Sequence, residues 1–383
     1  MPAIHAEGFT SEKFSPVRAA FEGNFASGAD LGASVSIRIG DETAVDLWGG
    51  FADAAGTRPW AEDTIVNVYS TTKTMTALTA LLLADRGLID FDAPVAKYWP
   101  QFAAGGKSRV TVAQIMSHSS GLSGWREPVT KEDLYDWERA VELLAAQEPF
   151  WEPGTASGYH AVTMGFLVGE VVRRVTGKSL GTVFREEIAE PLGADFWIGL
   201  PPSEDHRVAE LVPPPPGQGL DANLDALNEI QRNWIVNPLF SVDDSKTRAW
   251  RAAELGASNG QGNARSIALV HTILANGGVA KGKRFLSEAG CRKALELQME
   301  GTDLILATPL RVGLGFGLAG ALMPFLNKST MFWGGYGGSI AIIDMENRMS
   351  FGYAMNKMAG TTTGDLRALG LFMAALQVLG ATG

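Results

Sequence analysis

The 383-residue sequence contains one cysteine, Cys291, which can neither form an internal disulfide bond nor supply a pair of thiolate ligands to a metal. Its five histidines are scattered, and none belongs to an H-E-x-x-H motif, so the pattern gives no zinc site. Basic residues are also few, because 32 Lys and Arg stand against 42 Asp and Glu, a net charge of −10. That sign is wrong for a surface that binds phosphate backbones. We therefore expect no metal, no cofactor and no nucleic-acid partner.

Long apolar runs are missing too, since no stretch approaches the roughly 20 residues needed to span a bilayer. The segment Met1–Gly8 lacks the basic and apolar regions of a secretory signal. We expect a cytoplasmic protein without a membrane partner, and the oligomeric state stays unknown. Glycine, by contrast, is abundant: 45 residues occur without the period of three that collagen requires, which predicts many tight turns.

Two pairs of predicted strands lie near opposite ends of the chain. Apolar residues alternate with polar ones over residues 35–39, and after a short acidic interruption residues 44–48 form the second strand of a hairpin. A similar pair, residues 339–344 and 348–355, flanks another polar turn. Strands therefore come early and late, and the chain between them is mostly helical.

The order of these segments predicts an α/β (α+β) fold with two domains. An antiparallel sheet flanked by helices is expected from residues 1–105 together with 285–383, and an all-helical domain from the inserted residues 106–284. The apolar segment 366–379 predicts a final helix packed on the sheet. Helices inside the chain are predicted at residues 112–116, 140–144, 164–175 and 267–274.

Ser70 and Lys73 form the one S-x-x-K tetrad in the chain. Apolar residues at helical spacing follow it, so the tetrad is predicted to occupy the first turn of a buried helix. Residues three apart share a helix face, which lets Lys73 reach the Ser70 hydroxyl. The positive potential of a helix N-terminus would lower the pKa of Lys73, and a neutral lysine could act as a base. A serine that only caps the helix, with a solvated lysine, is the alternative.

Two further segments could contribute to the same site. Tyr159 lies where a loop runs into an apolar helix, and beside a lysine its phenol could relay a proton. The glycine-rich segment 333–339 precedes an apolar strand, where glycines let a ligand approach the strand edge and its N–H groups. A half-buried tyrosine and a simple turn are the alternatives for these two segments.

Ser70-Thr-Thr-Lys73, Tyr159 and the Trp333-Gly-Gly335 segment resemble, in order and rough spacing, the three motifs of serine β-lactamases and penicillin-binding proteins. The resemblance extends from about Phe14 to Gly380, is closest to the class C β-lactamase-like group, and implies a β-lactamase-like fold. Four other stretches carry it in detail: Gly87–Pro94, Met116–Leu122, Glu152–Thr155 and Gly313–Gly317.

Two departures from the lactamase pattern make the chain most similar to family VIII carboxylesterases. Tyr-x-Asn is replaced by Tyr159-His160-Ala161, so the carboxamide that contacts a β-lactam side chain is absent. Lys-Thr-Gly is replaced by Trp333-Gly334-Gly335, so an indole stands where a cation would meet the β-lactam carboxylate. An apolar wall at this place favours neutral esters.

The resemblance implies a serine carboxylesterase that hydrolyses small-molecule esters through an acyl-enzyme on Ser70. Lys73 and Tyr159 would share the proton transfers, and which of them is the base stays open. The backbone N–H groups of Ser70 and Tyr336 would form the oxyanion hole. Substrate-binding candidates are Trp333, Gly334, Gly335, Trp125 and His160.

Three alternatives to ester hydrolysis remain. An acyltransferase would use the same acyl-enzyme with an alcohol or amine in place of water. An amide or β-lactam hydrolase, with weak β-lactamase activity, would use it with another substrate. A nonenzymatic binding module belongs to a different class, and it is disfavoured because all three motifs retain compatible chemistry.

Overall fold

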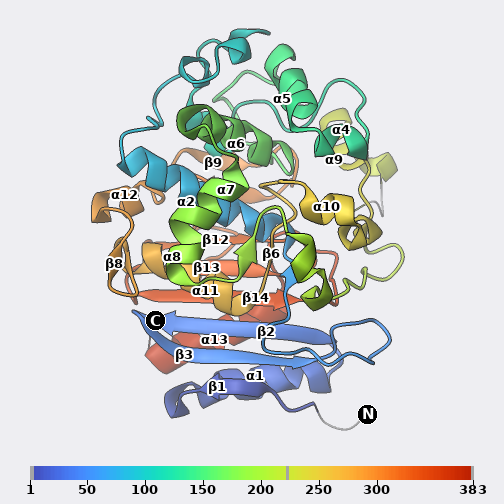
Figure 1. The fold of residues 1–383 in the computed structure, drawn as a ribbon, viewed down its shortest axis with the longest axis vertical. Helices are drawn as coiled ribbons and strands as arrows, with labels where there is room; N and C mark the ends of the chain where they lie inside the picture. The colour runs from blue at the N-terminus through green and yellow to red at the C-terminus, as the bar shows by residue number, and fades with distance from the viewer. Residues whose placement is uncertain (1–3, 221–223, 381–383) are drawn as a thin grey trace.

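The structure is a computed structural model that describes residues 4–220 and 224–380. Within these residues the largest element is a nine-stranded antiparallel sheet with the order β1-β3-β2-β14-β13-β12-β11-β10-β9. Its strands come from both ends of the sequence, which confirms the expected antiparallel sheet flanked by helices (Figure 1). The strands are β1 (Glu7–Thr10), β2 (Gly32–Ile39), β3 (Glu42–Gly50), β9 (Met299–Thr302), β10 (Pro309–Val312), β11 (Gly317–Leu318), β12 (Thr330–Gly334), β13 (Ile340–Asp344) and β14 (Met349–Met355).

Both predicted hairpins are confirmed. β2 pairs with β3, and β13 pairs with β14 across a turn in which the Asp344 carboxylate accepts the N–H groups of Glu346 and Asn347. The segment 333–339 precedes a strand as predicted, because β13 begins at Ile340, but its first two residues, Trp333 and Gly334, also end another strand, β12. β12 was missed because its residues, Thr-Met-Phe-Trp-Gly, are buried throughout and do not alternate.

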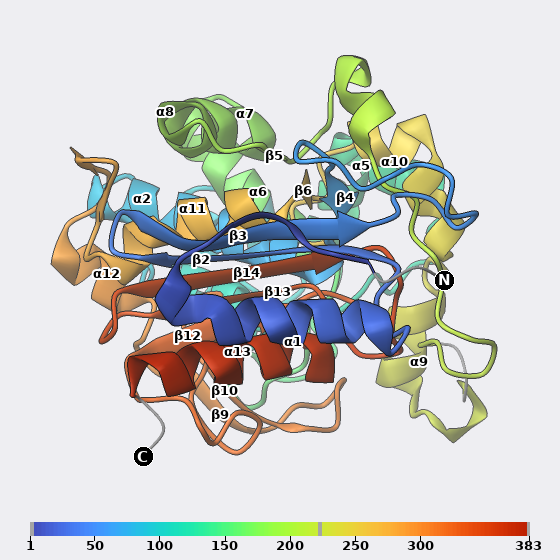
Figure 2. The same cartoon turned by 90° about the horizontal axis from the view of Figure 1, so that it is seen from below.

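Helices cover both faces of the sheet (Figure 2). α1 (Ser15–Ala26) and α13 (Leu366–Leu379) pack against each other on one face, while α2 (Thr72–Asp85) and α11 (Ala264–Ala275) lie on the other. The predicted final helix has the expected bounds. No helix of the described segments is long and apolar enough to cross a membrane.

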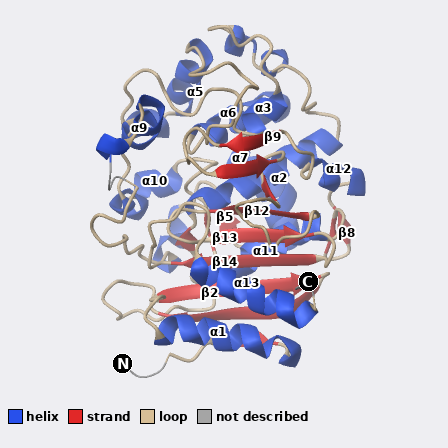
Figure 3. Cartoon of the chain, turned by 180° about the vertical axis from the view of Figure 1, so that it is seen from behind, coloured by secondary structure: helices blue, strands red, loops and turns tan. Residues whose placement is uncertain are grey.

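Most of the chain between α2 and α11 forms a helical region beyond one edge of the sheet (Figure 3). The helices predicted there are confirmed as α3 (Val112–Met116), α5 (Trp137–Ala146) and α6 (Thr163–Thr176). The other short elements are α4 (Lys131–Tyr135), α7 (Leu180–Phe184), α8 (Glu190–Leu192), α9 (Glu229–Val236), α10 (Arg248–Ala252), α12 (Glu288–Lys293), β4 (Val66–Asn67), β5 (Phe196–Trp197), β6 (Gln261–Gly262), β7 (Val279–Ala280) and β8 (Lys283–Arg284).

Helix α2 is the element that the other parts of the fold surround. Every residue from Thr72 to Leu83 is buried, and the helix contacts α6, α7, α12 and β12. The hydroxyl groups of its threonines form hydrogen bonds inside the protein. That of Thr79, for example, donates to the Met75 carbonyl 2.8 Å away. A lysine at the second position of this helix is therefore forced into the interior.

Close backbone contact joins α6 to the segment that precedes β6. A Cβ on Gly165 would lie 2.6 Å from the Ala257 nitrogen and 2.8 Å from the Gly256 carbonyl carbon. Backbone atoms cannot move aside as a side-chain end can, so only glycine fits at this point of α6. The contact fixes the backbone position of Ala257, whose carbonyl oxygen lies 2.9 Å from Lys73 Nζ.

Replacing Gly165 with alanine is therefore expected to destabilise the protein by about 1–3 kcal/mol, the usual range for overpacking a dense interior. The matched control is Gly23→Ala in α1, where a Cβ meets nothing within 4 Å. Since alanine favours helix, that variant should be stabilised by up to about 1 kcal/mol. Urea unfolding measures both, and equal stabilities for the two variants would contradict the packing described.

Candidate active site

Ser70 lies in a 3-10 turn, Tyr69–Thr71, that leads directly into α2. Tyr69 has φ = 42°, a left-handed conformation that is strained for a residue with a bulky side chain. The strand before the turn is held by β4–β6 pairing and by the Val68 N–H, which donates to the Gly260 carbonyl 2.9 Å away. The sharp turn leaves the Ser70 side chain half-buried at the end of the helix rather than within it.

The Lys73 amine lies in the interior with three oxygen neighbours. Its Nζ is 3.0 Å from Ser70 Oγ, 2.6 Å from the Ala161 carbonyl oxygen and 2.9 Å from the Ala257 carbonyl oxygen. Burial holds the pKa of Lys73 well below its usual range. The potential of a helix N-terminus was expected to lower the Lys73 pKa, but the cause is the loss of hydration on burial.

A neutral Lys73 fits these three neighbours with all its hydrogens used. A neutral amine has two hydrogens, which the two carbonyl oxygens accept, and one lone pair, which is then left for the Ser70 hydroxyl hydrogen. The same three contacts would leave an ammonium with no carboxylate partner, a costly state in the interior. The geometry therefore provides a proton acceptor 3.0 Å from the serine oxygen.

Tyr159 is the second partner of Ser70, and its hydroxyl donates to Ser70 Oγ at 2.6 Å. Its ring lies 4.7 Å from Lys73 Nζ, and the His118 and Trp333 rings pack against it at 5.1 and 5.5 Å between centroids. Burial raises the pKa of Tyr159 to about 12. At neutral pH the phenol is thus a proton donor beside a proton acceptor.

The glycine-rich segment reaches the Ser70 turn from the end of β12. A Cβ on Gly335 would overlap the Val68 carbonyl oxygen, so the strand end can touch the turn only through glycine. Ser339 Oγ donates to the same carbonyl at 2.8 Å and lies 3.0 Å from the Thr71 hydroxyl. These contacts place Tyr336 beside the turn, where its ring packs on the Tyr69 ring at 5.5 Å between centroids.

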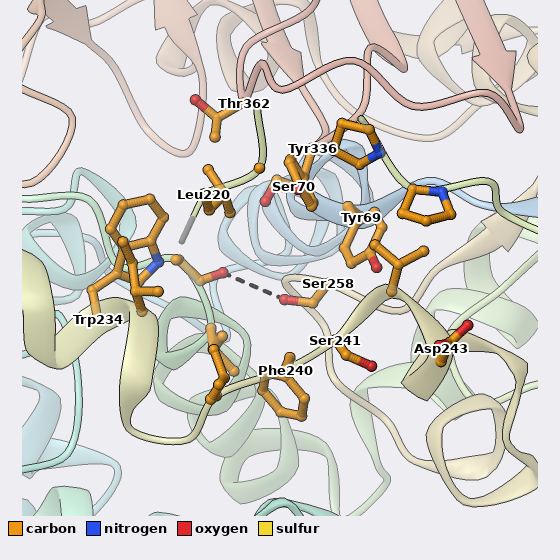
Figure 4. A pocket seen from close by; sticks show the side chains of 18 of the residues that line it. Tyr69, Ser70, Leu220, Trp234, Phe240, Ser241, Asp243, Ser258, Tyr336 and Thr362 are labelled. Carbon is orange, nitrogen blue, oxygen red and sulfur yellow. Dashed lines mark hydrogen bonds between the residues drawn. The ribbon is translucent and has the colours of Figure 1, made fainter. Parts of the chain in front are cut away.

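Ser70, Tyr159 and Tyr336 open into a cavity of about 630 Å³ (Figure 4). Among the described residues that line it, the one charged side chain is Asp243, and the rest are mostly apolar. The other lining residues are Tyr69, Ala161, Val162, Pro213, Pro214, Pro215, Pro216, Gly217, Gly219, Leu220, Trp234, Ile235, Pro238, Leu239, Phe240, Ser241, Val242, Trp250, Ser258 and Thr362.

The five candidate substrate-binding residues lie behind this lining rather than in it. The Trp125 indole donates to the Ala140 carbonyl at 3.1 Å and packs on Phe166 in the core of the helical region. His160 is fully buried, and its Nδ1–H donates to the Gly158 carbonyl at 2.5 Å. Trp333 and Gly334 end β12 and Gly335 follows it; all three are buried, with Trp333 packed on Tyr159, Gly334 on residues 363–364 and Gly335 on the segment before the Ser70 turn.

Most of the cavity wall comes from a segment that the sequence analysis left without elements. Residues 213–220 and 234–250 supply the proline loop, Trp234 of α9, and Phe240 and Trp250, whose rings pack at 5.1 Å. The signal available in the sequence was composition, because prolines are dense where periodicity is weak. The described residues contain no group of three or more potential metal ligands.

Comparison with known proteins agrees with this geometry. The family model described as Beta-lactamase matches residues 17–375. The Esterase/beta-lactamase LipL of Mycobacterium tuberculosis (strain ATCC 25618 / H37Rv) is 36% identical over 365 residues, which cover 92% of this chain and 83% of LipL.

Solved structures give the same picture. The crystal structure of a family VIII carboxylesterase is 45% identical, with a TM-score of 0.92 over 97% of this chain and 99% of the other. A penicillin-binding protein homologue from Caulobacter crescentus is 38% identical, with a TM-score of 0.89 over 97% of this chain and 99% of the other.

A neutral Lys73 has a measurable consequence for stability. Between the lowered pKa of the folded state and the ordinary value of about 10.4, the unfolded chain binds one proton more, so stability rises with pH. Lys73→Met removes that contribution, and the pH slope of its unfolding free energy should be smaller by about 1.4 kcal/mol per pH unit. Urea unfolding at pH 8 and pH 9 measures the slopes, with the exposed Lys328→Met as control. Equal slopes in the parent and Lys73→Met would show that the buried amine stays protonated.

Proposed function

This chain belongs to the beta-lactamase family, and from that membership we propose that it is a serine carboxylesterase that forms an acyl-enzyme on Ser70. Of the relatives compared above, the 45% identical structure is described as a family VIII carboxylesterase, and the 36% identical LipL as an esterase/beta-lactamase. The observation that carries the proposal is the position of Ser70 Oγ between Lys73 Nζ and the Tyr159 hydroxyl, at an apolar cavity. The cavity would be the cleft between a sheet domain (1–105 and 285–383) and a helical domain (106–284).

In the acylation step, Ser70 Oγ attacks the ester carbonyl carbon while the neutral Lys73 amine accepts the hydroxyl proton. The carbonyl oxygen becomes an oxyanion, which the backbone N–H groups of Ser70 and Tyr336 would stabilise. Burial makes Lys73 the acceptor and Tyr159 a donor, since it lowers the pKa of the amine and raises that of the phenol. This assigns the general base, which the motifs alone left open, to Lys73.

The tetrahedral intermediate then collapses and the ester C–O bond breaks. Tyr159 donates its proton to the leaving alkoxide and regains one from the Lys73 ammonium, so the free alcohol departs and both groups are neutral again. In deacylation water attacks the acyl carbonyl carbon while Lys73 takes its proton; the Lys73 ammonium then returns a proton to Ser70 Oγ as the bond from that oxygen to the acyl carbon breaks and the acid leaves. No cofactor enters the balance.

The lining of the cavity selects the substrate by charge. Its described residues include no Lys, Arg or His, and the one charge is the carboxylate of Asp243. A neutral ester can enter without losing hydration of a charge, whereas a substrate carboxylate would be left unpaired. The proposed substrates are thus neutral small-molecule esters, and β-lactams, which carry a carboxylate, are expected to turn over weakly.

An acyltransferase remains the second candidate because an apolar cavity favours a bound alcohol over water as acceptor. Product analysis with added alcohols separates the two activities. A cytoplasmic location belongs to the proposal as well, since the single thiol, Cys291, is buried and the fold relies on packing.

The acyl-enzyme mechanism predicts that Ser70→Ala lowers p-nitrophenyl ester hydrolysis at least about 10³-fold and removes covalent labelling by a fluorophosphonate. The control is Ser203→Ala, an exposed serine outside the cavity, which should label and turn over as the parent does. Hydrolysis of the p-nitrophenyl ester by Ser70→Ala at the rate of the parent protein would contradict the mechanism.

Charge selection predicts a large difference within one matched substrate pair. Mono-p-nitrophenyl adipate carries a free carboxylate where its methyl ester is neutral, and its kcat/KM should be about 100-fold lower. Thr362→Lys places a cation at the lining and should raise the acid-to-ester ratio about tenfold. An equal kcat/KM for the acid and its methyl ester would mean that the cavity does not discriminate between charged and neutral substrates.

A further inference from the structure

Tyr159 belongs to the helical region in sequence, yet its backbone is held by a residue of the sheet region. Asp303 follows β9, and its Oδ1 accepts the Tyr159 N–H at 3.1 Å. Its Oδ2 accepts the Ser157 hydroxyl at 2.6 Å, and the next residue, Leu304, donates its N–H to the Ser157 carbonyl at 2.8 Å. The loop that carries the phenol is thus tied to the connection between β9 and β10.

The carboxylate is itself fixed on the sheet side. Asp303 is 1% exposed, and its Oδ1 also accepts the N–H groups of Ile305 and Leu306, each at 2.9 Å. Among the described residues it makes no ion pair with a basic side chain, so N–H and O–H donors alone satisfy it. A buried carboxylate of this kind is costly to remove, because each donor would lose its acceptor.

Side-chain packing also joins Tyr159 to the sheet region. Tyr159 and Trp333 form a buried cluster with Ile305, Leu310 and Val312, which lie on the β9–β10 connection and on β10. The ring as well as the backbone of Tyr159 is therefore seated on the sheet edge. Ser70, its partner at 2.6 Å, lies at the start of α2, so the distance between them depends on how the sheet edge holds the tyrosine loop.

We propose that Asp303 is a positioning residue for Tyr159, an inference that rests on the proton-transfer role given to Tyr159 above. Its carboxylate fixes the loop so that the phenol stays in hydrogen-bonding reach of Ser70 Oγ. A displacement of about 1 Å at a reacting group can lower the rate about 10²-fold. The negative charge also assists the role: after burial, the largest cause, it helps keep the pKa of Tyr159 at about 12 and the phenol protonated.

A double-mutant cycle on kcat for p-nitrophenyl butyrate tests the link between the two residues. Asp303→Ala is expected to lower kcat about 10²-fold with KM within about threefold. In a Tyr159→Phe background the same change should alter kcat less than about threefold, because the group that Asp303 positions is gone. Asp303→Asn keeps Oδ1 for the three N–H donors and should recover most of the lost kcat.

The matched control is Asp344→Ala. Asp344 is also 1% exposed and accepts two backbone N–H groups in a turn, but it lies at the end of β13 away from Ser339. Its loss should lower the Tm while leaving kcat within about twofold. Should Asp303→Ala fail to fold, Ser157→Ala, which removes one of the ties, enters the same cycle with an expected loss of about threefold to tenfold.

An equal loss of kcat in the parent and Tyr159→Phe backgrounds would overturn the inference, as would parental kcat in Asp303→Ala. Parental kcat in Tyr159→Phe would overturn it too, since no group would need positioning. Failure of the acyl-enzyme proposal shows differently, as activity retained in Ser70→Ala, so the two failures are distinguishable.

Discussion

The site depends on one constraint, which is that the Lys73 amine is buried with two carbonyl oxygens and the Ser70 hydroxyl as its neighbours. Burial lowers the pKa of this amine, so a neutral Lys73 would be a base that needs neither a carboxylate nor an imidazole to activate it. The surrounding structure serves that burial. α2 is enclosed along its length, and Gly165 lets α6 press the segment with Ala257 against the amine.

Three parts of the fold meet at Ser70, and each contributes a different property. The Tyr69–Thr71 turn and α2 carry Ser70 and Lys73, the proposed nucleophile and base. The end of β12 touches the turn through Gly335 and brings Tyr336 beside it. The loop 157–159 carries Tyr159, the proposed proton donor, and Asp303 would fix that loop to the edge of the sheet. The cavity wall, with Asp243 as its one charge among the described residues, leaves substrate choice to shape and neutrality.

Sequence reasoning reached Ser70, Lys73 and Tyr159 because a helix places residues three apart on one face and because the motif order is specific. It also predicted the two hairpins and the long helices α2, α6, α11 and α13, where periodicity is strong, but not α1. It missed β9–β11, which are too short to show a period, and β12, which is buried throughout. Trp125 and His160 resisted prediction because the direction of a buried side chain depends on tertiary packing: both are turned toward backbone carbonyls in the core. Asp303 is 144 positions from Tyr159 and belongs to no motif.

The central claim is that ester cleavage passes through a covalent intermediate on the serine that the buried amine activates. The most direct measurement is mass spectrometry of the protein quenched during turnover of a slowly hydrolysed ester, followed by peptide mapping. The account predicts one acyl group per chain, attached to the peptide that contains Ser70, formed faster as pH rises through the lowered pKa of Lys73. An acyl group on any other peptide, or full turnover with no covalent species, would contradict it.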